Sequence, residues 1–206
     1  SLQSIDSLKD EVLNLFSGCI REKSVSILVE AFTYNRDYLL ENKKANKKRI
    51  IMSGDKKISI DKVDMTILKQ LSENARKSVI NIAEEIGVSE RVVNYRIKQM
   101  IKNEIILGFK IALNYNILGL LFYKSFIYLD EPDAIKIKRL VDYFESHKNI
   151  ITHVKVLGNW DLEPEFEVNS EFEFSEILKD MKDKFSDIIK NIDVVTISKE
   201  HKFVYL

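Results

Sequence analysis

The sequence is short of the residues that cross-link, kink or loosen a chain. Its 206 residues include one cysteine, two prolines and six glycines. A single cysteine, Cys19, allows no disulfide within the chain and no cysteine zinc cluster. So few prolines and glycines exclude collagen-like and flexible low-complexity character. The longest apolar stretch, residues 105–129, is interrupted by polar side chains, so we expect no membrane span and a cytoplasmic protein.

Apolar and charged side chains are both plentiful. Hydrophobic residues make up 45% of the chain and charged residues 31%, which is enough for a core in one or two domains. The net charge is zero, but residues 41–57 hold seven basic and two acidic side chains, whereas residues 120–206 hold 12 and 17. A basic middle between acidic flanks indicates one module that meets a polyanion and neighbours that meet protein or small ligands.

Three short helices are predicted in the middle of the chain. Asp61, Ser78 and Ser89 are of the residue types that cap helix N-termini, and each precedes a helical pattern of apolar residues. Gly87 ends the second helix, where glycine adopts a positive φ at little cost. Extended structure over Ile105–Leu113 then predicts a strand pair. Together these elements give a winged helix-turn-helix pattern.

The third of these helices has one apolar and one polar face. The apolar residues Val93, Ile97, Met100 and Ile101 are expected to face inward. The opposite face then carries Glu90, Arg91, Asn94, Tyr95, Lys98 and Lys102. Arginine, asparagine and lysine side chains on one helix face can read base edges or hold phosphates. A structural three-helix bundle with a solvated face would show the same pattern, but the adjacent basic stretch favours nucleic-acid binding.

The order of elements after residue 120 predicts a ferredoxin-like domain. Strands are predicted over 121–129, 150–157, 162–168 and 194–203, and helices over 133–147 and 170–189. This β-α-β-β-α-β order is the split-βαβ arrangement, and it makes the chain an α+β protein. Pro164 has no N–H to donate, so it predicts a bulge or a shortened ladder in the third strand.

The first forty residues repeat the end of that domain. Phe16–Glu30 aligns with Phe185–Lys199 at a shift of 169 residues, and both segments predict a helix followed by a strand. We expect a helix around 5–20 and a strand around 24–34. Half a ferredoxin-like module cannot form a complete core of its own. Its apolar stripe should therefore lie against a neighbouring chain or against the second module, the ferredoxin-like domain after residue 120.

These patterns divide the chain into four parts. They are the second half of a ferredoxin-like module (1–40), a basic linker (41–57), a winged helix-turn-helix domain (58–115) and a ferredoxin-like domain (116–206). The linker is either a solvated connector or a connector that also touches phosphates.

Residues 60–206 resemble the leucine-responsive/asparagine regulators, the Lrp/AsnC family. The motifs that carry the resemblance are Ile60-Asp61-Lys62-Val63-Asp64, Asn74-Ala75-Arg76, Ile82-Ala83, Gly87-Val88-Ser89, Arg96-Ile97, Ile105-Ile106-Leu107-Gly108-Phe109 and Gly158-Asn159-Trp160-Asp161-Leu162. Glu104 departs from the family pattern, which usually has glycine before the wing. The N-terminal half-module also departs from the family's two-domain plan.

The resemblance implies a sequence-specific transcriptional regulator that forms a homodimer, or a higher homo-oligomer, through its ferredoxin-like RAM domain. Double-stranded DNA is the implied partner, and the implied interface residues are Lys77, Ser78, Ser89, Glu90, Arg91, Asn94, Tyr95, Arg96, Lys98 and Lys102. Among them, Arg96 matches a position that supports the fold or holds phosphate. No metal or cofactor is implied.

The resemblance also implies a small effector, such as an amino acid, at the turn of Gly158, Asn159, Trp160 and Asp161. In this interpretation Asp161 holds the amino group of the effector. In the alternative interpretation the residues form an ordinary hairpin turn, in which Asp161 bonds only local backbone.

Two other function classes share features with this sequence. Sirohaem decarboxylases have the same two-domain shape, but they carry a tetrapyrrole pocket and an Asn-x-Met-x-x-Trp-like stretch that residues 120–126 lack. His147, His153 and His201 show no ligand spacing. A protein-interaction module would show no salt-dependent DNA binding. The sequence therefore favours a regulator that is not an enzyme.

Overall fold

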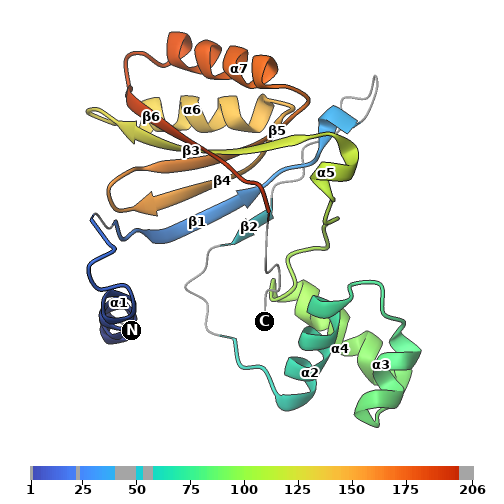
Figure 1. Ribbon diagram of the computed structural model, residues 1–206. Helices are drawn as coiled ribbons and strands as arrows, with labels where there is room; N and C mark the ends of the chain where they lie inside the picture. The colour runs from blue at the N-terminus through green and yellow to red at the C-terminus, as the bar shows by residue number, and fades with distance from the viewer. Residues whose placement is uncertain (1, 22–23, 40–49, 53–57, 200–206) are drawn as a thin grey trace.

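The computed structural model describes residues 2–21, 24–39, 50–52 and 58–199 (Figure 1). Its elements in chain order are α1 (Leu2–Leu15), β1 (Ile27–Thr33), the 3-10 helix η1 (Asp37–Leu39), β2 (Ile50–Met52), α2 (Lys62–Glu73), α3 (Val79–Ile86), α4 (Glu90–Lys102), α5 (Tyr115–Leu118), β3 (Leu121–Leu129), α6 (Ala134–Ser146), β4 (Ile150–Leu157), β5 (Leu162–Val168), α7 (Glu171–Lys184) and β6 (Ile189–Thr196). In these ranges no helix is both long and apolar enough to cross a bilayer.

The three predicted helices form a small unit of their own, α2 to α4. Asp61 caps α2 in a capping box with Asp64, and Gly87 ends α3 with a φ of +71°. A separate apolar core holds the helices together, and its buried members are Ile67, Ile82, Ala83, Val93 and Met100. The sequence signals for these helices are therefore confirmed.

The predicted wing strands are wrong in detail, because no strand lies between α4 and β3. The N–H groups of Ile105 and Ile106 both donate to the carbonyl oxygen of Met100, at 2.8 and 3.1 Å. These bonds close the end of α4, so the two amides make no cross-strand ladder. The short helix α5 then leads into β3, and it has no counterpart in the predicted elements.

Six antiparallel strands form one sheet in the order β2-β1-β4-β5-β3-β6. The last four, β4-β5-β3-β6, are the predicted ferredoxin-like arrangement, with α6 and α7 together on one face (Figure 1). Core side chains such as Phe144, Phe166 and Met181 lie between these helices and the sheet. The pairing of β3 with β5 is interrupted between Lys124 and Ile127, opposite Pro164. This confirms the shortened ladder predicted from that proline.

Two predicted boundaries in this domain are wrong. α7 ends at Lys184 rather than near residue 189, and β6 begins at Ile189 rather than at residue 194. The N–H groups of Ile188 and Ile189 both donate to the carbonyl oxygen of Phe185, which turns the chain directly from helix into strand. Apolar residues at 188 and 189 fit either pattern, so the sequence did not locate this turn. Residues 200–203 of the predicted strand lie outside the described residues.

The N-terminal segment extends the same sheet. β1 (27–33) pairs with β4, and β2 pairs with β1, so the strand predicted around 24–34 lies against the ferredoxin-like domain. The helix predicted around 5–20 is α1, which ends at Leu15, and the described side chains of its apolar stripe are exposed rather than packed on that domain. Ile50–Met52 is thus a strand within the stretch that we expected to be linker, and its backbone pairs with β1 from Ala31 to Thr33. The other residues of that stretch, 41–49 and 53–57, lie outside the described residues.

Candidate nucleic-acid interface

Helix α4 presents its polar face to solvent. Val93 and Met100 are buried in the core of the helical unit, and Ile97 packs against that core. The prediction that Ile101 also faces inward is wrong, because its side chain is exposed just before the helix ends at Lys102. The side chains on the opposite face are all exposed, namely Glu90, Arg91, Asn94, Tyr95, Lys98 and Lys102. A helix with one face buried and basic and amide groups on the other has the form needed to enter a groove of DNA.

Two serines fix the starts of the helices at this surface. The Ser78 hydroxyl accepts from the Asn81 N–H at 3.1 Å, and the Ser89 hydroxyl accepts from the Val92 N–H at 3.4 Å. Both serines are exposed N-caps. They orient α3 and α4, and their helix N-termini carry the positive end of the helix dipole.

Arg96 and Lys77 differ from the other basic residues because each is held in ion pairs within the helical unit. Arg96 Nη1 lies 2.8 Å from Asp61 Oδ2 and 3.3 Å from Asp64 Oδ2. Lys77 Nζ lies 2.6 Å from Glu85 Oε1. The pKa of Asp61 is held below its usual value, first by the Asp64 N–H that its carboxylate accepts and then by the Arg96 guanidinium. Arg96 thus fastens α4 to the start of α2.

The turn predicted as an effector site is tied to the protein's own backbone. Asp161 Oδ2 accepts from the Leu129 N–H at 2.8 Å. Trp160 donates from Nε1 to Glu163 at 2.7 Å and lies against the Phe126 ring, 4.6 Å between centroids. A Cβ on Gly158 would come within 2.5 Å of Ser26 Oγ, so the segment before β1 lies directly on the turn.

A buried ion pair that the sequence did not indicate lies on the sheet face away from α6 and α7. Glu167 on β5 is fully buried, and Arg36 makes a forked pair with it, with Nε–Oε2 at 2.8 Å and Nη2–Oε1 at 2.9 Å. Tyr38 also donates to Glu167. No local signal could have revealed this cluster, because its partners are 131 and 129 residues apart in the chain.

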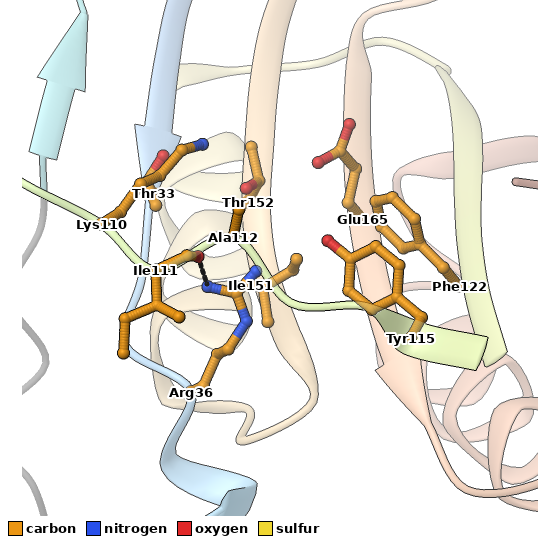
Figure 2. Close-up of a pocket in the computed structure, with 10 residues that line it drawn as sticks. All are labelled: Thr33, Arg36, Lys110, Ile111, Ala112, Tyr115, Phe122, Ile151, Thr152 and Glu165. Carbon is orange, nitrogen blue, oxygen red and sulfur yellow. Dashed lines mark hydrogen bonds between the residues drawn. The ribbon is translucent and has the colours of Figure 1, made fainter. Parts of the chain in front are cut away.

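Arg36 also lines a narrow cleft between β1, the segment before α5 and the open sheet face (Figure 2). Its Nη1 donates to the carbonyl oxygen of Ile111 at 3.4 Å, and Tyr115 and Glu165 face the same space. The cavity volume is about 30 Å³, room for roughly one water molecule. A tetrapyrrole does not fit there, and no histidine lines the cleft.

Of the two described histidines, His153 is buried in the core and His147 is half-buried at the end of a helix. His153 is fully buried, stacks on Phe32 at 4.4 Å and meets the Tyr34 hydroxyl through Nδ1 at 2.6 Å. His147 ends α6 beside Tyr143. His201 lies outside the described residues. Within the described ranges, no three His, Cys, Asp or Glu side chains gather as a metal site would require.

Comparison with known proteins matches the helical unit and the whole fold separately. Residues 60–106 match a family described as winged helix-turn-helix DNA-binding. The HTH-type transcriptional regulator PH1916 of Pyrococcus horikoshii is 32% identical over 111 residues, which cover 50% of this chain and 69% of that protein. The HTH-type transcriptional regulator Ptr1 of Methanocaldococcus jannaschii is 42% identical over 60 residues, which cover 29% of this chain and 40% of that protein.

Solved structures share the fold. An AsnC family transcriptional regulator from Agrobacterium tumefaciens superposes with a TM-score of 0.63 at 18% identity, over 71% of this chain and 95% of that one. AsnC from E. coli gives a TM-score of 0.61 at 20% identity, over 72% of this chain and 99% of that one.

Proposed function

The chain belongs to the Lrp/AsnC family of HTH-type transcriptional regulators, and from this premise we propose that α4 reads the major groove of its DNA site. The observation that carries the proposal is the polar face of α4, which stays exposed when its apolar face is buried in the helical unit. Recognition helices of helix-turn-helix proteins contact base edges in this way.

We assign different roles to the residues of that face. The Asn94 amide matches the N6/N7 edge of adenine, and Arg91 can make two bonds to guanine. Lys98 and Lys102, farther along α4, are placed to hold phosphates. Tyr95 and Glu90 flank the reading residues, and Ser78 and Ser89 set the two helix N-termini near the backbone. Arg96 and Lys77 act by holding the helical unit together.

A homodimer through the ferredoxin-like domain would place two copies of α4 in successive major grooves. The support is the sheet face opposite α6 and α7, where the Phe126–Trp160 pair is only half-buried and Val195 is exposed. Apolar groups on an open sheet face are suited to meeting a second sheet. With DNA as the partner, we place the protein's action in the cytoplasm and assign it no enzymatic step.

We propose that an effector, if it is an amino acid, is held at the turn of Gly158, Asn159, Trp160 and Asp161. Only Oδ2 of Asp161 is engaged by the Leu129 N–H, so Oδ1 can accept from an amino group. A solved structure that shares the fold is a complex of a Neisseria meningitidis transcriptional regulator with L-Met. Asp161→Ala should leave DNA binding by the free protein intact and remove its response to an amino-acid panel.

The DNA interface is tested by separating base contacts from phosphate contacts. The preferred site is first selected from genomic fragments, and binding is then measured against salt on that site and on random DNA. Asn94→Ala should cost about 1–3 kcal/mol on the preferred site and much less on random DNA. Lys98→Ala and Lys102→Ala should each weaken binding to both and lower the salt slope by about 0.9.

A lysine far from the helical unit provides the matched control. Lys182 is an exposed residue of α7, so Lys182→Ala should leave affinity and salt slope unchanged. If the α4 variants behave like Lys182→Ala, the polar face of α4 is solvated surface and the proposal is wrong. Absorbance after incubation with sirohaem is a separate check, since a bound tetrapyrrole band would favour the decarboxylase class.

A further inference from the structure

The helical unit is joined to the sheet by a stretch without regular structure. Residues 107–114, the connecting segment, lie between α4 and α5 and form neither helix nor strand. The side chains of Leu107, Phe109 and Ile111 in this segment are exposed. A segment of this kind has no hydrogen-bond ladder of its own, so the contacts that it makes with the sheet determine where α4 is held.

Arg36 supplies one of these contacts from a distant part of the chain. Its Nη1 donates to the carbonyl oxygen of Ile111 at 3.4 Å, while its Nε and Nη2 donate to Glu167 at 2.8 and 2.9 Å (Figure 2). A guanidinium is planar and has five donors, so one side chain can bond both partners at once. Arg36 therefore ties the connecting segment to β5.

Glu167 is a fixed anchor for this tie. Its side chain is fully buried on β5, which lies between β4 and β3 in the sheet. Tyr38 donates to the same carboxylate, and the Glu167 N–H donates to the carbonyl oxygen of Asn149 at 3.0 Å. Because the carboxylate is held from several directions, the connecting segment cannot carry Arg36 away with it.

The connecting segment also lies close to the end of β1. Lys110 and Ala112 line the same narrow cleft as Thr33 of β1 and Thr152 of β4 (Figure 2). The cleft holds only about 30 Å³, which leaves the segment little room to move. Directly after the segment, the ring of Tyr115 lies 4.9 Å from that of Phe122 on β3. The segment is thus held at two points, by Arg36 and by Tyr115.

We propose that Arg36 is a positioning residue for DNA binding, which fixes the connecting segment on the sheet and so sets the distance between the α4 helices of a dimer. The inference rests on the proposed function, in which each copy of α4 occupies one major groove. Each base pair added between two half-sites turns one of them by about 35° around the DNA axis. A dimer with fixed segments therefore accepts a narrow range of half-site spacings.

Two variants remove the bond to Ile111 without leaving Glu167 as an unpaired charge. Lysine has one side-chain nitrogen, so Arg36→Lys keeps a cation beside Glu167 but has no second arm for Ile111. Arg36→Met with Glu167→Gln removes both charges together. Tyr38→Phe is the matched control, because it removes a contact to Glu167 and leaves Arg36 in place. Thermal unfolding verifies that each variant is folded.

Tryptic cleavage after the exposed Lys110 reports directly on the connecting segment. Its rate follows the fraction of molecules in which the segment has left the sheet. Cleavage between Lys110 and Ile111 should be about fivefold faster in both Arg36 variants than in the wild type, since local opening has lost one restraint. Tyr38→Phe should be cleaved at the wild-type rate.

The role in positioning is measured on the selected DNA site, with the spacing between half-sites changed in steps of one base pair. The wild type should lose about 100-fold in affinity when two base pairs are inserted, because both copies of α4 no longer engage together. Both Arg36 variants should lose about tenfold or less on the same DNA, because freed segments can follow the displaced half-site. Tyr38→Phe should keep the wild-type spacing profile.

Three results would overturn the inference. They are wild-type cleavage rates in both Arg36 variants, faster cleavage with an unchanged spacing profile, and a wild type that binds all spacings equally well. A wild type that selects no DNA site would instead refute the proposed function, and the positioning role with it. Arg36 variants that bind the optimal site but keep the narrow spacing profile refute the positioning role alone.

Discussion

Glu104 adopts a backbone conformation that suits glycine. Its φ is +59°, in the left-handed region that non-glycine residues occupy at a cost of about 1–2 kcal/mol. The Lrp/AsnC pattern usually has glycine here, so the departure seen in the sequence is a point of local strain. The residue is exposed at the end of α4, so a change there removes no core contact.

Glu104→Gly should therefore raise the free energy of unfolding of the helical unit by about 0.5–1 kcal/mol, after the greater freedom of glycine in the unfolded chain is subtracted. Denaturant unfolding measures the change. The neighbouring Asn103 has an ordinary φ of −87°, so Asn103→Gly should lower stability. Equal effects of the two changes would contradict the strain argument.

Gly158 is required by a close approach rather than by its φ. A Cβ there would lie 2.5 Å from Ser26 Oγ and 3.0 Å from Ser26 Cα. Because Cα is a backbone atom, relieving this contact requires the neighbouring residues to shift as well. Gly158→Ala should push residues 24–26 off the turn and cost about 1–3 kcal/mol. Ser26→Gly in the same chain removes two of the three close atoms, so the double variant should recover part of the loss. Thermal unfolding of the two single variants and the double variant measures this recovery. A double variant no more stable than Gly158→Ala would show that the Ser26 side chain is not the cause of the loss.

At the scale of elements, α2 and α4 are joined by charge as well as by their apolar core. The Arg96 guanidinium bridges Asp61 and Asp64 at the start of α2. Arg96→Ala should lower the melting temperature of the helical unit while the salt slope of DNA binding stays near that of the wild type. This outcome is opposite to that for Lys98→Ala, which should change the slope and leave stability alone. A lowered slope for Arg96→Ala would return this residue to the phosphate-binding set.

At the scale of the whole molecule, one buried ion pair fastens the N-terminal segment to the sheet. Removing Arg36 leaves Glu167 buried beside Tyr38 without a cation, and unpaired buried charges are strongly unfavourable. Arg36→Met should lower the free energy of unfolding by about 3 kcal/mol and make the β1 amides exchange hydrogen faster. Adding Glu167→Gln removes the stranded charge and should restore much of the stability. A double variant no more stable than Arg36→Met would show that packing of the arginine side chain is what matters.

The sequence by itself determined those parts of the protein in which the deciding residues are close neighbours. Caps at Asp61, Ser78 and Ser89, the turn at Gly87 and the apolar periods between them specify the three helices. They also leave the basic and amide side chains of α4 on the face opposite its buried residues. The β-α-β-β-α-β order and the interrupted ladder at Pro164 follow from similarly local patterns.

Tertiary structure decided which partner each of those faces meets. An apolar or charged pattern shows that a side chain needs a partner but carries no information on where in the chain it lies. The sequence thus left open that β1 would join β4, that Glu167 would pair with Arg36, and that Arg96 would pair with Asp61. Backbone N–H groups of a sheet edge pair with any strand of suitable register, so only the folded arrangement selects among the strands within reach.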